Sequence, residues 1–298
     1  MLKLHQKKMQ NKLTKIAADT NSFLKRFIKK QKKTELIIPM NYGLFSGGKK
    51  IRSKILFDVG SIFNINYYTL IKIGAAVECI HAYSLIHDDL PCMDNDSMRR
   101  GKPATHIKFG ESTAVLAGNS LLTLAFEILS SKDINLNEKI KNSLVNKISE
   151  CSGHLGIAGG QFLDLSFEHK KVSKKQIIDM EIKKTGKLFS FCCSAPLIIK
   201  NKKTIEIKSF EKIGSDIGLL FQVADDLIDY KGSSAIAGKK TRKDEKQGKA
   251  TLISLMGYNN AVKYAEKISF NLKKSIKKYG SKSENLKQTI DYILYRDK

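Results

Sequence analysis

Paired cysteines, long apolar runs and signal-like segments are missing from the sequence, and each absence narrows the class of protein. The chain has 298 residues and five cysteines, none of them in a Cys-x-x-Cys pair. An odd count without that spacing argues against a disulfide framework and against a zinc site, so we expect free thiols in the reducing cytoplasm. No run of about 18 apolar residues occurs, and the N-terminus lacks the apolar stretch of a signal peptide. We therefore expect no integral membrane segment.

Acidic residues are scarce beside basic ones. There are 29 Asp and Glu against 53 Lys and Arg, which gives a formal net charge of +24. Such a charge raises the question of a polyanionic partner, either nucleic acid or a phosphorylated metabolite. A nucleic-acid-binding protein would carry a concentrated basic face with interleaved aromatic residues. The lysines are instead spread thinly over polar helix faces, so we expect no nucleic acid partner.

Proline and alternating strand patterns are also scarce. Only four prolines occur, and apolar residues recur mostly with a period near 3.6, which predicts an all-α fold. No repeat, linker or break in composition interrupts the chain, so we expect one all-α domain over residues 1–298. Turn signals stand at NYGLFSGG, RRGKPATH, GIAGGQ and KGSSAIAGKK. The expected helices cover residues 10–30, 48–63, 67–89, 111–130, 137–158, 173–199, 204–230, 249–255, 259–278 and 284–295.

Two of these segments are apolar around most of their circumference. The stretches IKIGAAVECIHAYSLIH and FSFCCSAPLII are typical of central helices in a large helical bundle. The first of them runs directly into LIHDDLPCMDNDSMRRG, residues 85–101, where four aspartates and two arginines surround one proline. A central helix that ends in acids would place those acids at the mouth of the bundle.

The spacing of the first acidic cluster requires a bend. Asp88 and Asp94 are six residues apart, which separates them by roughly 240° on an ideal helix. Pro91 lacks an N–H and disfavours a helix interior, so the chain should kink or leave the helix there. Asp94 can then fold back toward Asp88. The simpler interpretation of Pro91 is that it only ends the helix.

A second acidic cluster occurs far downstream, in FQVADDLIDY. Asp225 and Asp229 are four residues apart and share one helix face, where their repulsion is unfavourable unless something neutralises it. A single cluster of this kind is more often an exposed acidic turn. Two clusters, each at the end of an apolar helix, favour a cation site. All the candidate ligands are hard oxygens without an accompanying histidine and cysteine set, which favours Mg²⁺ over zinc.

Basic residues near glycines or helix boundaries suit the phosphate oxygens that usually complete the coordination of Mg²⁺. Each of them alone would be a solvated side chain; the pattern matters because a backbone can approach a phosphate closely at such places. His81 lies two turns before Asp88 on nearly the same stripe, although a lone histidine on an apolar face is usually a core residue. The basic residues in question are Lys49, Lys50, Arg52, Arg99, Arg100, Lys183, Lys184, Lys239, Lys240 and Lys249.

In this order the motifs GGKKIR, ECIHAYSLIHDDLPCMDNDSMRRG, GGQFLDL, KTG, FQVADDLIDY and GKAT resemble the trans-prenyltransferases, or polyprenyl diphosphate synthases. The resemblance runs from about Leu13 to the C-terminus and is strongest to bacterial members that make farnesyl diphosphate. It implies a homodimeric all-α bundle of the isoprenoid synthase type with a central apolar cavity. It also implies a head-to-tail condensation of isopentenyl diphosphate with an allylic diphosphate, with about three Mg²⁺ ions per active site between carboxylates and diphosphate oxygens.

The resemblance assigns roles residue by residue. The expected metal ligands are Asp88, Asp89, Asp94, Asp225 and Asp229. The expected contacts to the allylic diphosphate are Arg99, Lys184, Thr185, Gln222 and Lys239. Those to isopentenyl diphosphate are Lys49, Arg52, His81 and Arg100. The residues expected to be catalytic are Asp88, Asp94, Lys184 and Asp225.

Product length is expected to depend on packing below the first acidic motif. Tyr83 and Ser84 would line the first part of the cavity. Tyr83, together with a two-residue insertion in the acidic motif, resembles the C15-forming bacterial members, and we expect Tyr83 to limit chain growth. The sequence also departs from the family's usual pattern. Ser53 replaces a proline after GGKKIR, and Asn95, Ser97 and Ser233 stand where acids are common; none of these changes removes an expected direct contact.

Other functions remain open. A longer-chain, geranylgeranyl diphosphate synthase would share every motif. A class I terpene cyclase also uses aspartate-bound Mg²⁺, but it would carry an N-S-E-type second motif and would need no site for isopentenyl diphosphate. A non-catalytic helical partner subunit would be expected to lack one acidic motif.

Overall fold

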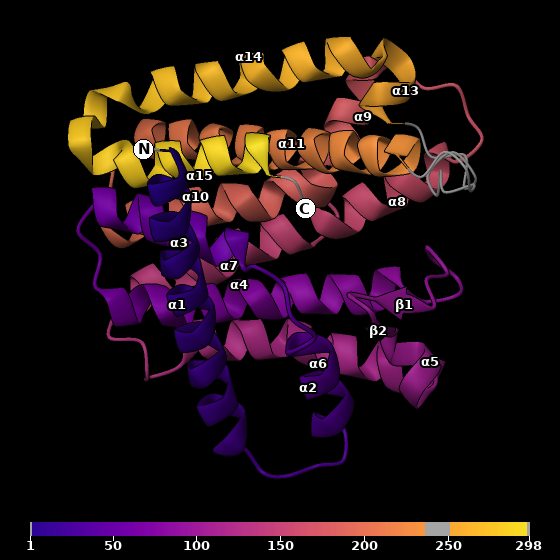
Figure 1. Ribbon diagram of the computed structural model, residues 1–298. Coiled ribbons are helices and arrows are strands. Elements are labelled where there is room, and N and C mark those ends of the chain that lie inside the picture. The colour runs from indigo at the N-terminus through magenta and orange to yellow at the C-terminus, as the bar shows by residue number, and fades with distance from the viewer. Residues whose placement is uncertain (1, 236–250, 297–298) are drawn as a thin grey trace. The chain divides into compact units, whose positions relative to one another are not determined.

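The computed structural model describes residues 2–235 and 251–296, with side chains for 9–231 and 251–296 (Figure 1). The described residues are mostly helical, which confirms the predicted all-α fold. They group into two compact units. The first consists of residues 2–146 with 198–201, and the second of residues 147–197, 202–235 and 251–296. The single domain expected over the whole chain stays a prediction.

The first unit contains the N-terminal helices and one small hairpin. Its helices pack around α4, which contacts α1, α2, α3 and α6, and Figure 1 shows α4 and α6 side by side. The elements are α1 (Leu2–Lys29), α2 (Ile37–Leu44), α3 (Ile51–Ile62), α4 (Tyr67–Asp88), β1 (Met98–Arg99), β2 (Lys102–Pro103), α5 (Thr105–Phe109), α6 (Glu111–Ser130) and the first part of α7 (Glu138–Ser152).

Helix α4 is the core helix of this unit. Its N-terminus is capped by Asn66, whose side chain accepts hydrogen bonds from the N–H groups of Tyr68 and Thr69. The apolar side chains of α4 from Leu70 to Ile86 are buried around most of the circumference of the helix. Burial of this apolar surface stabilises the first unit. By length and composition α4 and α6 could each cross a membrane; their most apolar windows are 72% and 44% buried. Extensive burial of this kind also characterises the core helix of a soluble protein.

The second unit is built on the long helix α11. Helices α14 and α15 pack on α11 and on each other, and Figure 1 shows α14 running along α11. The elements are the rest of α7, then α8 (Ile157–Phe167), α9 (Lys174–Glu181), a π-helical turn η1 (Ile182–Gly186), α10 (Lys187–Ile199), α11 (Thr204–Ala235), α13 (Leu252–Met256), α14 (Tyr258–Ile276), a 3₁₀ segment η2 (Lys277–Ser283) and α15 (Glu284–Tyr295).

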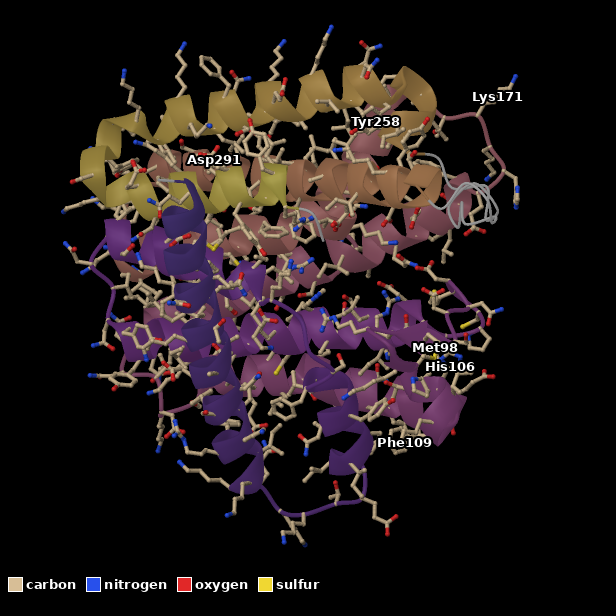
Figure 2. The ribbon with its side chains drawn as sticks, viewed as in Figure 1. Met98, His106, Phe109, Lys171, Tyr258 and Asp291 are labelled. Atoms are coloured by element: carbon tan, nitrogen blue, oxygen red, sulfur yellow. The ribbon has the colours of Figure 1, made fainter. Side chains whose placement is uncertain are left out.

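Two side-chain contacts fix α14 against its neighbours. Tyr258 at its start stacks on Tyr230 of α11, with ring centroids 5.3 Å apart. Lys273 near its end pairs with Asp291 of α15 at 2.7 Å. Tyr258 and Asp291 are labelled in Figure 2. One end of α14 is therefore held on α11 and the other on α15.

Several local predictions need correction. The GIAGGQ segment was expected to be a turn, but it opens α8, because the glycine at 160 lets that helix lie against the backbone of Lys184. NYGLFSGG was likewise expected to be a turn, yet its first four residues end α2. The expected helix 173–199 is interrupted by η1, while 67–89, 111–130 and 284–295 match α4, α6 and α15 closely.

Candidate active site

The chain folds back on itself where α4 ends. Asp88 is the last residue of α4, and its carbonyl accepts a hydrogen bond from the N–H of Asp94 at 2.8 Å. A second bond, from the N–H of Asp96 to the carbonyl of Asp89 at 3.1 Å, closes the same loop. Pro91 lies in the turn between them. The predicted fold-back of Asp94 onto Asp88 is therefore confirmed for the backbone.

The side chain of Asp89 points away from solvent and toward an arginine. It is 3% exposed and accepts from Nε of Arg99 at 2.8 Å and from Nη2 of the same guanidinium. Arg99 also reaches Oδ2 of Asp96 at 3.3 Å. Burial raises the pKa of Asp89 above its ordinary value, and the Arg99 guanidinium partly offsets this. The carboxylate of Asp89 is thus engaged by Arg99; its role as a metal ligand stays a prediction.

The hairpin β1–β2 sends two successive arginines to different partners. Its loop consists of Arg100 and Gly101, both with positive φ, as a type I′ turn requires. Arg99 turns to Asp89, whereas Nη1 of Arg100 donates to the carbonyl of Gly47 at 2.5 Å. Figure 2 labels Met98 of β1 next to His106 of α5 at this end of the unit. That the two arginines serve different diphosphates stays a prediction.

The glycines of GGKKIR allow Arg100 to lie against the backbone. Gly48 has φ +101°, and a Cβ there would overlap the Arg100 guanidinium. Lys50 follows in the left-handed region, with φ 53°, and leads into α3. Lys49 is exposed beside it. This segment therefore gathers cationic groups at the start of α3, where a phosphate could also approach the backbone.

Arg52 and His81 meet between α3 and α4. Nη1 of Arg52 lies 3.3 Å from Nε2 of His81. Burial lowers the pKa of His81 well below its ordinary value, and the nearby cations Arg52, Arg100 and Lys50 lower it further. The imidazole is consequently neutral at physiological pH. An anion bound beside this neutral ring would be stabilised by the surrounding cations, whereas a further cation would be repelled by them.

In the second unit, the three acids of FQVADDLIDY lie on α11. Arg296 pairs with Asp225 at 2.5 Å, donates to the carbonyl of Phe221 at 3.2 Å and stacks over that ring, 3.9 Å from its centroid. Asp226 accepts from Nε2 of Gln222 at 3.0 Å, and Oγ1 of Thr185 lies 3.4 Å from Oε1 of the same glutamine. The expected allylic contacts Thr185 and Gln222 are thus brought together.

The KTG motif lies in η1, the π-helical turn. Such turns are rare and frequently occur at functional sites. Nζ of Lys184 pairs with Oδ2 of Asp164, from α8, at 2.5 Å. Asp164 was not among the predicted site residues, although GGQFLDL, which contains it, was one of the motifs that carried the resemblance. The ion pair joins α8 to η1.

Tyr83 and Ser84, the residues expected to set product length, both lie on α4. Tyr83 is buried in α4, and its ring meets that of His87 edge-on, with centroids 5.6 Å apart. Burial, with the Asp88 carboxylate, raises the pKa of Tyr83 to about 12. Ser84 donates to the carbonyl of His81, within its own helix, at 3.0 Å. Lys239, with Lys240 and Lys249, lies outside the described residues.

Among the described residues, no group of three or more histidine, cysteine, aspartate or glutamate side chains is arranged to hold a metal ion by itself. The donor types nevertheless fit Mg²⁺, because each acidic cluster offers only carboxylate oxygens and phosphate oxygens would supply the rest. Asp88 with Asp94 belongs to the first unit, and Asp225 with Asp229 to the second.

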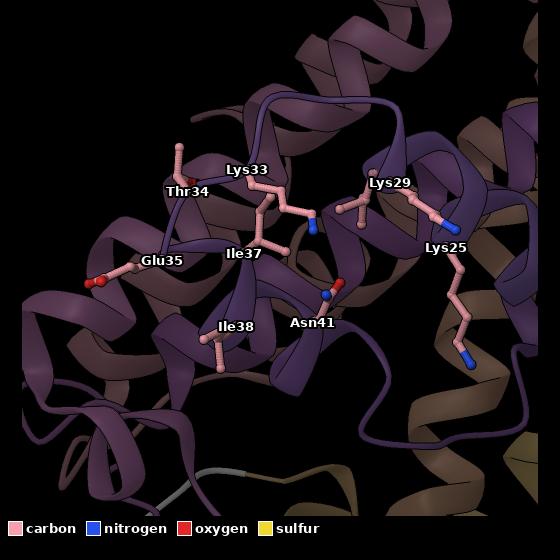
Figure 3. A pocket seen from close by; sticks show the side chains of 9 residues that line it. Lys25, Lys29, Lys33, Thr34, Glu35, Ile37, Ile38 and Asn41 are labelled. Carbon is pink, nitrogen blue, oxygen red and sulfur yellow. The ribbon is translucent and has the colours of Figure 1, made fainter.

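A separate pocket lies in the first unit, between the end of α1 and the start of α2 (Figure 3). Its volume is about 620 Å³. None of the predicted site residues lines it. The lining consists of Lys25, Ile28, Lys29, Lys33, Thr34, Glu35, Ile37, Ile38 and Asn41.

Comparison with solved structures identifies the class of fold. The apo crystal structure of a FPP/GFPP synthase from Zymomonas mobilis is similar with a TM-score of 0.85 and 34% identity, over 96% of this chain and 99% of that one. The fold is therefore that of the isoprenoid synthases.

Comparison of sequences gives the family. The family model for polyprenyl synthetase matches residues 33–293. Farnesyl diphosphate synthase of Escherichia coli (strain K12) is 39% identical over 285 residues, which cover 93% of this chain and 95% of that protein. A chloroplastic geranylgeranyl pyrophosphate synthase of Catharanthus roseus is 35% identical over 260 residues, 87% of this chain and 73% of that protein. The chain belongs to the polyprenyl synthetase family.

This membership settles the reaction class. The protein is a polyprenyl diphosphate synthase, a prenyltransferase of isoprenoid biosynthesis. Members of the family join isopentenyl diphosphate to an allylic diphosphate and use Mg²⁺. The chain is similar both to a farnesyl and to a geranylgeranyl diphosphate synthase. The length of its product therefore has to be argued from its own residues.

Proposed function

We propose that the protein is a farnesyl diphosphate synthase, which condenses isopentenyl diphosphate with dimethylallyl or geranyl diphosphate and releases diphosphate. The observation that carries the proposal is that cationic and hydrogen-bonding side chains form two sets. Arg52, Arg100 and the neutral His81 form one set in the first unit, and Lys184, Thr185 and Gln222 form another in the second. A condensation of two diphosphates needs one such set for each.

The first set suits isopentenyl diphosphate. Lys49, Arg52 and Arg100 would offset its charge, and the neutral ring of His81 would donate one hydrogen bond. The Arg100 guanidinium, already held by the carbonyl of Gly47, needs little rearrangement to face an anion at the glycines. Preorganised donors of this kind hold the double bond of the substrate close to its reaction partner.

The second set suits the allylic diphosphate. Arg99, Lys184, Thr185, Gln222 and Lys239 are proposed to bind its oxygens, and Asp88, Asp89, Asp94, Asp225 and Asp229 to hold the metal. Bound Mg²⁺ would supply charge neutralisation on the leaving diphosphate. Asp164 would keep Lys184 directed toward the phosphate. About three ions per site are expected on the family pattern.

The proposed reaction depends on stabilising the charges that develop as the allylic C–O bond breaks. The allylic C–O bond breaks, and negative charge develops on the diphosphate, which the cationic side chains stabilise. The double bond of isopentenyl diphosphate supplies the electron pair for the new C–C bond. On the family pattern, the proton lost from C2 goes to the departing diphosphate. Apolar walls would exclude water, which could otherwise trap the cation.

Tyr83 is proposed to set the C15 product length. It is buried one turn before His87 on α4, and its bulk would block a growing chain beneath the first acidic motif, with Ser84 beside it. The alternative is a geranylgeranyl diphosphate synthase, which the likeness to the Catharanthus roseus protein favours. A terpene cyclase is a remote alternative, because the second motif here is D-D-rich and the first unit holds a separate group of cationic side chains, proposed here for isopentenyl diphosphate.

The test is incubation with isopentenyl and geranyl diphosphates, with and without Mg²⁺, followed by mass spectrometry of the products. The proposal expects farnesyl diphosphate and Mg²⁺-dependent diphosphate release. A C20 product would establish the geranylgeranyl alternative, and a cyclised hydrocarbon the cyclase. We also propose a cytoplasmic homodimer; light scattering of the purified protein at about twice the monomer mass would support the dimer, and monomer mass would refute it.

A further inference from the structure

Ser53 makes a buried contact through a hydroxyl group that the usual family proline could not provide. It lies in the first turn of α3 and is fully buried. Its Oγ donates to Oε1 of Glu78, on α4, at 2.7 Å. The carbonyl of Gly74 lies 3.4 Å from the same Oγ. Because the Glu78 bond is shorter and its acceptor is charged, it is the stronger of the two.

Glu78 connects this hydroxyl to the start of α3. Its side chain is 5% exposed, and its other oxygen, Oε2, lies 3.4 Å from Nζ of Lys50, which is also 5% exposed. The carboxylate is therefore held from one side by a hydroxyl and from the other by an ammonium group. A buried carboxylate oxygen that loses its donor is costly. Without the Ser53 hydroxyl, Glu78 would turn further toward Lys50.

The Ser53–Glu78 bond lies next to the Arg52–His81 contact. Arg52 and Ser53 are consecutive on α3, and Glu78 and His81 are three residues apart on α4, on one face of that helix. The two contacts therefore connect the same turns of the two helices. Gly74, one turn earlier on α4, keeps this approach close, because a Cβ there would lie 3.2 Å from Oγ of Ser53.

We infer that Ser53 is a positioning residue for isopentenyl diphosphate: through Glu78 it fixes α3 on α4 so that Arg52 meets His81 and Lys50 stays beside the glycines. It does not touch the substrate itself. The inference rests on the proposed function, since it assigns the Arg52–His81 pair to that diphosphate. Of the proposed allylic contacts, Arg99 is held by Asp89 and not by α3, and Lys184, Thr185 and Gln222 lie on η1 and α11, so binding of the allylic diphosphate should not depend on Ser53.

The test compares Ser53→Ala with Ser61→Ala. Ser61 is also on α3, but its Oγ donates to the carbonyl of Asp58 at 2.8 Å, within the same helix. Steady-state kinetics would give KM for isopentenyl and geranyl diphosphates separately, and calorimetry would give the Kd of isopentenyl diphosphate alone. We expect Ser53→Ala to raise KM and Kd for isopentenyl diphosphate roughly tenfold, as the loss of one oriented contact would. The KM for geranyl diphosphate and kcat should stay within about twofold, and Ser61→Ala should match the wild type.

A double-mutant cycle shows whether Ser53 acts through Glu78. Adding Ser53→Ala to Glu78→Gln should leave the Kd of isopentenyl diphosphate nearly where Glu78→Gln alone puts it. If Ser53→Ala does not fold, Ser53→Cys, which keeps the shape with a weak donor, carries the same prediction. An unchanged Kd, equal shifts for both substrates or additive effects would overturn the inference. Failure of the wild type to turn over either substrate would instead refute the proposed function.

Discussion

The guanidinium of Arg296 pairs with Asp225 at 2.5 Å while it stacks over the ring of Phe221. The arginine side chain is 5% exposed and the aspartate 41%. Asp225 opens the second acidic motif, so a residue near the C-terminus occupies one side of a carboxylate that is proposed to bind metal. Arg296 and Mg²⁺ would therefore compete for the same charge.

Removal of Arg296 should lower the Mg²⁺ requirement. We expect Arg296→Ala to reduce the Mg²⁺ concentration for half-maximal activity several-fold, because the carboxylate loses a competing cation. Calorimetric titration with Mg²⁺ and an allylic diphosphate analogue should show the same direction. Lys273→Ala is the control, since it breaks another ion pair with α15, to Asp291, that involves no motif residue. An unchanged or increased requirement in Arg296→Ala would contradict the competition.

Two adjacent lysines of η1 provide a matched test of the allylic site. Lys184 pairs with Asp164 at 2.5 Å and Lys183 with Asp179 at 3.0 Å. We expect Asp164→Asn to raise KM for geranyl diphosphate about tenfold, because Lys184 loses the partner that orients it. Asp179→Asn removes an exposed pair and should change KM by less than about twofold. Equal effects of the two substitutions on KM would contradict a specific role of the Asp164–Lys184 pair in binding geranyl diphosphate.

The buried histidine gives a pH prediction. Burial and the neighbouring cations lower the pKa of His81 in the folded protein well below 6.5, so the unfolded chain takes up this proton first as the pH falls. Stability therefore decreases as the pH falls below 6.5, by up to about 1.4 kcal/mol per pH unit from this group. Above pH 6.5 the group contributes no slope.

The corresponding experiment is urea denaturation between pH 5 and 8. His81→Asn should weaken the pH dependence of the unfolding free energy below pH 6.5, whereas substitution of the exposed His154 by Asn should leave it as in the wild type. If His81→Asn and the wild type show the same slope, the imidazole is charged in the folded state.

Tyr83 should determine product length. Tyr83→Ala is expected to give products longer than C15, because it removes the ring that would block the growing chain. The substitution should also cost roughly 3 kcal/mol of stability, as the loss of a buried aromatic ring does, so a melting curve must accompany the assay. Tyr68→Ala is the control, since that ring is 72% exposed at the start of the same helix. Unchanged products by mass spectrometry would exclude Tyr83 as the limit.

The sequence predicts best what depends on local rules. The fold-back of Asp94 followed from Pro91 and the helical period, and it is seen in the hydrogen bond to Asp88. The turn after the two arginines followed from the signal in RRGKPATH, whereas the short β1–β2 hairpin that contains it was not predicted. Contacts between distant segments have no such signal: Arg296 reaches Asp225 across 71 positions, and only packing of α15 on α11 brings them together.

The prediction of a turn was wrong where a glycine allows two segments to pack closely. The glycine at 160 was assigned to a turn, but it lies in α8 because Lys184 needs that space. KTG carries part of the family resemblance, but nothing in its spacing predicts that it forms a π-helical turn. Asp164 is not predicted as a site residue, because its pairing with Lys184 depends on how α8 and η1 pack together.

The most direct test of the central claim is the product of one reaction. Purified protein is incubated with isopentenyl and geranyl diphosphates and Mg²⁺, and the products are measured by mass spectrometry beside a sample containing a chelator. The account predicts farnesyl diphosphate as the main product, equal amounts of released diphosphate, and neither in the chelated sample. No diphosphate release with Mg²⁺, or release that persists without any divalent metal, would contradict it.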